Sequence, residues 1–136
     1  MQSNKTDTAS CSVIKVRGLH KNFGPREVLR GINLDVRAGD ILSVMGPSGS
    51  GKSTLLYCMA GILAADKGEV FFNGKNLAHY SANSLIALRK TSFGFIFQFG
   101  ELISELPVRD NIALPLLLRG VRKKQAYKTA DEWASL

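Results

Sequence analysis

The sequence holds 136 residues, of which 45% are hydrophobic and 21% charged, and its formal net charge is +7. These fractions are typical of a soluble globular protein, and the length predicts one domain with a modest core. The longest apolar stretch, residues 55–65, is too short to span a bilayer, and the basic residues are scattered, which argues against a nucleic-acid-binding surface.

The N-terminal segment, residues 1–12, is polar and lacks the apolar stretch of a secretory signal. We therefore expect residues 1–12 to be a disordered tail and residues 13–136 to be the N-terminal part of a folded domain. Cys11 and Cys58 have no metal-ligand spacing, and two isolated cysteines fit a reducing compartment. Both are expected to be inert thiols.

Four segments before residue 75 have the patterns of β-strands. Residues 13–19 alternate apolar and polar side chains, as a half-buried strand does, and residues 28–36 alternate again after a Gly24-Pro25 turn. Residues 40–45 form an apolar run that predicts a strand buried on both faces. Residues 68–74 predict a further strand, closed by an Asn-Gly turn.

Residues 46–53 read GPSGSGKS, a complete G-x-x-x-x-G-K-[ST] phosphate-binding loop. Its glycines let backbone N–H groups approach a polyphosphate without side chains in the way. Apolar residues at helical spacing follow the motif, so a helix is expected to open at about Gly51 with its first-turn N–H groups facing the anion. Lys52 would reach the β- and γ-phosphates, and the Ser53 hydroxyl would bind Mg²⁺. The motif therefore predicts nucleotide binding.

Beyond residue 80 the pattern is mainly helical. Helices are expected at 81–90, at 107–118, where Pro115 would kink or end the helix, and at 121–136. The last of these places Ala126, Tyr127, Ala130 and Trp133 on one face and stops while still periodic. Between the helices, residues 92–98 predict a strand that returns to the core.

These motifs, in this order, resemble the ATP-binding subunits of ATP-binding cassette (ABC) transporters. The resemblance is almost continuous from Val13 to about Asp131, and it rests on residues 19–24 with 28–34, 46–54, 68–74 and 93–98. Residues 97–102 and 108–116 are most similar to the group that serves lipoprotein-releasing and macrolide- or peptide-exporting permeases.

The resemblance implies roles for particular residues. Phe23 stands where the family places an aromatic that stacks on adenine, and phenylalanine keeps that π-face; a core aromatic is the alternative. Gln98 matches the glutamine that contacts Mg²⁺ and the attacking water, although a surface glutamine is its plain alternative. Lys52 and Gln98 are the candidate catalytic residues, and Ser53 and Gln98 the candidate metal ligands. The residues expected to bind Mg-ATP are Phe23, Gly46, Pro47, Ser48, Gly49, Ser50, Gly51, Lys52, Ser53 and Thr54.

Other motifs of the family have no counterpart in the sequence. There is no LSGGQ-like signature and, after Gln98, no apolar strand ending in Asp-Glu, so the second magnesium aspartate and the catalytic glutamate are lacking. His20 and His79 do not match the position of the family's γ-phosphate histidine. We expect this sequence to be the N-terminal half of a subunit and to be inactive in ATP hydrolysis by itself.

The expected fold is α/β, a phosphate-loop core sheet with a small antiparallel β-subdomain, truncated before the core completes. The resemblance implies an ATP-binding subunit on the cytoplasmic face of the membrane that pairs with a second such subunit and powers export by a separate permease. Two alternatives stay open: a soluble ABC ATPase acting on nucleic acid or ribosomes, and a non-functional remnant. No inserted basic arm is visible, so nucleic acid is not an expected partner.

Overall fold

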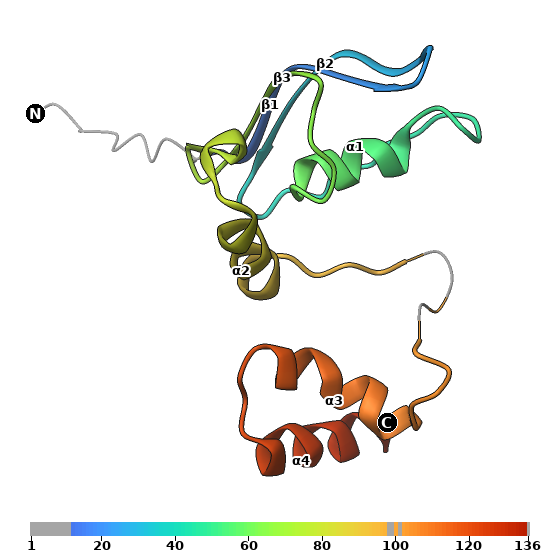
Figure 1. Cartoon of the computed structure of the whole chain (residues 1–136), viewed down its shortest axis with the longest axis vertical. Coiled ribbons are helices and arrows are strands. Elements are labelled where there is room, and N and C mark those ends of the chain that lie inside the picture. Colours follow the sequence, from blue (N-terminus) through green and yellow to red (C-terminus); the bar gives the residue numbers. More distant parts are fainter. Residues whose placement is uncertain (1–11, 98–99, 101, 136) are drawn as a thin grey trace, which may run out of the picture. The chain divides into compact units, whose positions relative to one another are not determined.

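The computed structural model describes residues 12–97, 100 and 102–135, and the chain divides into two compact units between Leu85 and Ile86 (Figure 1). Helix α2 (Ala82–Ser92) crosses this division. The other elements are β1 (Ser12–Phe23), β2 (Arg26–Arg37), α1 (Lys52–Met59), β3 (Lys67–Phe72), β4 (Lys75–Asn76) and the 3-10 turn η1 (Leu77–His79) in the first unit, and α3 (Val108–Leu118) and α4 (Lys123–Ala134) in the second.

The first unit contains an antiparallel sheet with strand order β2-β1-β3-β4. The alternating segments predicted from the sequence form β1 and β2, which are longer than expected and meet at the Gly24-Pro25 turn. Val16 and Leu19 of β1 are almost completely buried, and the apolar face of α1 supplies Leu55 and other buried residues to the same unit. The expected antiparallel subdomain is therefore present.

One glycine is essential to the contact between β1 and β3. Gly68 has φ +87°, and a Cβ atom there would lie 2.2 Å from the carbonyl oxygen of Gly18. The strand register shifts at this place, between Arg17 and His20. A side chain at residue 68 would therefore force the two strands apart as well as strain the backbone.

The second unit is built around alanines. Ala113 of α3 and Ala126 and Ala130 of α4 are fully buried, and larger apolar side chains pack around them. Such small residues let two helices approach closely along their contact. Pro115 does not end α3, which continues to Leu118, because its C-terminal leucines pack on this alanine core. Trp133, expected on the packed face, is 66% exposed.

Two expected core strands are not formed. Neither residues 40–45 nor 93–97 are assigned to a strand, and Ile41 and Ile96 are about 98% and 102% exposed. A strand buried on both faces needs a hydrogen-bonded neighbour and covering helices, and no described strand pairs with either segment. The core sheet is thus incomplete within the described residues. No described helix combines the length and the hydrophobicity needed to cross a membrane.

Candidate nucleotide-binding site

The phosphate loop leads directly into α1, as the motif predicts. Gly51 is the N-cap of this helix and has φ +97°. A Cβ atom on Gly51 would come within 2.7 Å of Val28 Cγ1 and 3.2 Å of the Val28 carbonyl oxygen. A Cβ atom on Gly46 would lie 2.8 Å from Ser50 Oγ. The loop therefore excludes side chains at both glycines, and it leaves the backbone accessible for a polyphosphate.

The charge distribution at the loop also suits an anion. The first turn of α1 has neither an acidic residue nor a side-chain cap, so the positive end of the helix dipole is uncompensated by either. Lys52 Nζ donates hydrogen bonds to the carbonyl oxygens of Gly46, at 2.9 Å, and Pro47, at 2.8 Å. Its ammonium group is thereby held over the loop. Ser53, in the same first turn, has an exposed side chain that could reach a metal ion beside the phosphates.

The tip of the β1–β2 hairpin contacts this loop through Arg26. Arg26 Nη2 donates to the carbonyl oxygen of Gly49 at 3.2 Å. An open groove of about 600 Å³ lies between the start of β2 and residues 49–50. Sequence reasoning missed Arg26, because a single arginine after a Gly-Pro turn carries no signal of a contact to a distant loop.

Phe23 lies at the end of β1, directly opposite Arg26 in the strand register. Its side chain is 50% exposed, and Lys21 Nζ lies 5.8 Å from the ring centroid. Arg26 is thus both the strand partner of Phe23 and a residue that contacts the phosphate loop. Gln98, the other residue with an expected role, lies outside the described residues.

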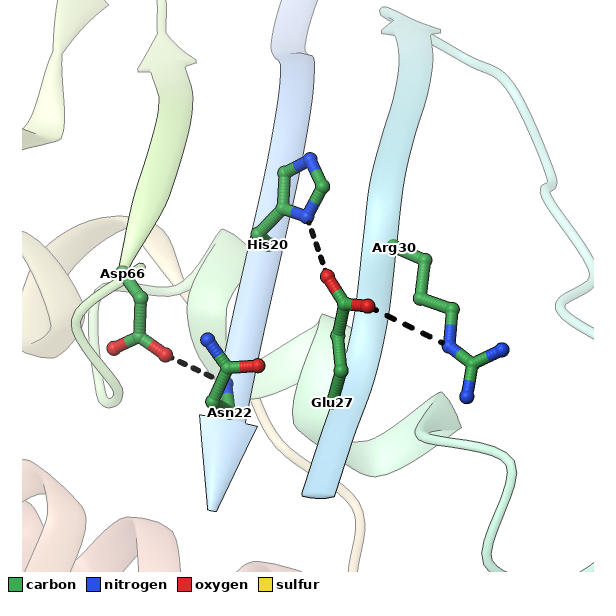
Figure 2. Close-up of polar contacts among 5 residues, drawn as sticks. All are labelled: His20, Asn22, Glu27, Arg30 and Asp66. Atoms are coloured by element: carbon green, nitrogen blue, oxygen red, sulfur yellow. Dashed lines mark hydrogen bonds and ion pairs between the residues drawn. The ribbon is translucent and has the colours of Figure 1, made fainter. Parts of the chain in front are cut away.

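Glu27 of β2 contacts one side chain of β1 and one of its own strand. His20 Nδ1 lies 2.8 Å from Glu27 Oε1, and Arg30 Nε lies 3.8 Å from Glu27 Oε2. Both contacts are drawn as dashed lines in Figure 2. Because these groups are partly exposed, their pairing contributes little stability. We assign them a structural contact and no chemical role.

The structure offers no preassembled metal site in the part it describes. No group of three or more His, Cys, Asp or Glu side chains is clustered there. Burial raises the pKa of the Cys58 thiol, which favours the protonated form. This is consistent with the inert role expected for Cys58. Within the described residues, a magnesium ion at this site would depend on Ser53 and on the nucleotide's own phosphates.

Comparison with known proteins defines the family. The profile of the ABC transporter family matches residues 29–136. The lipoprotein-releasing system ATP-binding protein LolD of Bacteroides thetaiotaomicron is 38% identical over 120 residues, which cover 88% of this chain and 55% of LolD. The methionine import ATP-binding protein MetN of Rhizobium johnstonii is 37% identical over 136 residues, or 100% of this chain and 37% of MetN.

Solved structures agree with these relatives. A bacterial ABC transporter cassette, solved as a dimer, superposes with a TM-score of 0.80 at 31% identity, covering 88% of this chain and 54% of the cassette. The same cassette in a post-hydrolysis state with ADP and phosphate gives a TM-score of 0.79. The α/β fold is therefore that of an ABC ATPase cassette.

The chain belongs to the ABC transporter family. It spans about half the length of the LolD relatives that it matches.

Proposed function

We propose that this chain is the nucleotide-holding part of an ABC transporter ATP-binding subunit. Residues Gly46 to Thr54 would bind the phosphates of ATP, with Lys52 on the β- and γ-phosphates and Ser53 on Mg²⁺. The single observation that carries this proposal is the loop itself: glycines that exclude side chains, an uncompensated helix N-terminus and the Lys52 ammonium group held over the loop.

Phe23 would bind the base by stacking. Its half-exposed ring and its connection to the phosphate loop through Arg26 support this role, whereas a core aromatic would be buried. Stacking uses a π-face, which all purines offer, so the site would bind ATP and GTP with similar affinity. Gln98 would complete the magnesium shell and orient the attacking water.

The whole subunit would power export through a separate permease, at the cytoplasmic face of the membrane, and would pair with a second ATP-binding subunit. Export is favoured by the resemblance of residues 97–102 and 108–116 to the lipoprotein-releasing group and by the likeness to LolD. Loss of the intact protein would then impair lipoprotein release. Reduced methionine uptake with normal lipoprotein release would instead favour the function named for MetN.

By itself the chain would hold Mg-ATP without hydrolysing it. Phosphoryl transfer depends on positioning and on charge stabilisation, and the loop supplies these for the bound nucleotide. Activating the water needs a further group. Gln98 could orient a water molecule, but its amide cannot accept the proton, and the family's catalytic glutamate has no counterpart in this sequence.

Nucleotide binding tests the proposal through Lys52. Removing a charge-assisted hydrogen bond costs about 1.5–3 kcal/mol, so Lys52→Ala should weaken Mg-ATP binding by about 10- to 150-fold in calorimetric titrations. Lys75→Ala, which removes an exposed lysine of β4, is the matched control and should bind as the parent does. A folded Lys52→Ala variant with unchanged affinity would show that the loop is not the phosphate site.

A further inference from the structure

Strand β1 extends beyond the end of its neighbour β3. The pairing of these strands ends at His20 and Lys67, whereas β1 continues to Phe23. Along its last residues β1 still pairs with β2 on its other side. Residues 21–23, which end in the aromatic Phe23, thus lack a β3 partner on one side. A strand edge of this kind leaves backbone N–H and C=O groups without a ladder partner.

Asp66, immediately before β3, takes the place of the missing strand. Its backbone N–H donates to the His20 carbonyl oxygen at 3.0 Å. Its carboxylate then accepts hydrogen bonds from the Asn22 backbone N–H, at 2.5 Å, and from Lys21 Nζ, at 2.8 Å. Figure 2 shows the contact between Asp66 and Asn22 at the end of β1. One residue therefore holds the backbone on either side of Lys21 as well as the Lys21 side chain.

The Lys21 contact links Asp66 to the aromatic ring. Lys21 Nζ, fixed by the carboxylate, lies 5.8 Å from the centroid of the Phe23 ring. The Lys21 side chain is 15% exposed and that of Asp66 35%, so this pair is better shielded than the other ion pairs of the hairpin. Hydrogen bonds from Lys21 and from the Asn22 backbone also lower the pKa of Asp66, because both stabilise its charged form.

We propose that Asp66 is a positioning residue for base recognition: it fixes the end of β1 and the Lys21 ammonium group so that Phe23 presents its ring to the base of the nucleotide. The inference rests on the proposed stacking role of Phe23. It assigns Asp66 no contact with the phosphates, because the hydrogen bonds of its carboxylate and of its backbone N–H go to Lys21, Asn22 and His20 of β1. Loss of Asp66 should therefore weaken binding of the base and leave phosphate binding intact.

Two ligands separate these effects: Mg-ATP, and Mg-tripolyphosphate, which has no base. Phe23→Ala should weaken Mg-ATP by about three- to tenfold, the value of aromatic stacking. Asp66→Ala should cause a loss up to the same size, and the double variant should bind no more weakly than Phe23→Ala alone. Tripolyphosphate affinity should stay within about twofold of the parent in all three variants, since phosphate contacts dominate its binding.

Asp35→Ala is the matched control, because Asp35 also pairs with a β1 lysine, Lys15, at 3.6 Å, but has no contact with the end of β1. It should leave both affinities unchanged. Unchanged Mg-ATP binding by Asp66→Ala, with weaker binding by Phe23→Ala, would overturn the inference and leave the role of Phe23 standing. If Asp66→Ala weakened the affinities for Mg-ATP and Mg-tripolyphosphate equally, Asp66 would have a general structural role, and the inference would also be overturned. If Phe23→Ala left the Mg-ATP affinity unchanged, Phe23 would have no stacking role, and the inference about Asp66 would fail with it.

Discussion

Two kinds of apolar segment in this chain differ in burial. The strands of the antiparallel sheet are paired, whereas segments 41–45 and 93–97 pair with no described strand. The sheet completes its pairing over β1 to β4 and buries Val16 and Leu19. Segments 41–45 and 93–97 also consist mostly of apolar residues, yet their side chains Ile41 and Ile96 are almost fully exposed. The β1–β2 and β3–β4 pairs are joined by short turns and so have their partners nearby in sequence, whereas parallel strands need crossover connections and partners from distant parts of a chain. Apolar character alone therefore does not bury a strand.

Truncation of one leucine and one isoleucine tests this contrast most strongly. Leu19→Ala removes a fully buried side chain and should lower the free energy of unfolding by about 2–5 kcal/mol. Ile41→Ala should change it by less than about 0.5 kcal/mol, because the side chain is 98% exposed. Urea unfolding measures both. A comparable loss for Ile41→Ala would mean that residues 41–45 are packed in solution.

Two glycines with positive φ, Gly68 in a close strand contact and Gly74 in open space, sharpen the account of the sheet. Gly68→Ala should cost about 3 kcal/mol or more, since it combines a positive φ with a backbone clash at the β1–β3 contact. Gly74 has a similar φ of +76°, but nothing lies within 4 Å of the Cβ atom that Gly74→Ala would add. Its cost should be about 1 kcal/mol. The same urea experiment compares the two, and equal losses would contradict the close approach of β1 and β3.

Substitution of Arg26 tests whether the antiparallel sheet positions the phosphate loop. Arg26→Ala removes its hydrogen bond to Gly49, worth about 0.5–1.5 kcal/mol, so Mg-ATP and Mg-tripolyphosphate should both bind about two- to tenfold more weakly. Arg30→Ala is the control, because Arg30 lies on the same strand, is 76% exposed and contacts Glu27 instead of the loop. Equal affinities for Arg26→Ala and Arg30→Ala would remove Arg26 from the site.

Local patterns predicted much of this structure. Alternation located β1 and β2, the motif located the phosphate loop before α1, and helical spacing located α2, α3 and α4 within a few residues. The resemblance of these motifs indicated the ABC transporter family, which the match over residues 29–136 confirms. These successes share one feature, which is that the determining residues are neighbours in sequence.

Features that depend on distant residues were predicted less well. Residues 40–45 and 92–98 were expected to be strands from their own composition, but a strand also needs a neighbour that no described residue supplies. Pro115 was expected to kink or end its helix; α3 does not end there but continues to Leu118, and Leu116 and Leu117 pack on the alanine core. Arg26 contacts Gly49, which is 23 positions away in the sequence, and Asp66 contacts Asn22, which is 44 positions away. No local sequence pattern predicts either contact.

Steady-state release of phosphate from Mg-ATP tests the central claim most directly, which is that this chain holds the nucleotide but lacks the group that activates water. The 136-residue chain should release phosphate at the background rate even when its loop is saturated with Mg-ATP. The Lys52→Ala variant should then show the same rate as the parent, because neither hydrolyses the nucleotide. Release well above background that is lost in Lys52→Ala would contradict the account and place catalysis within these residues.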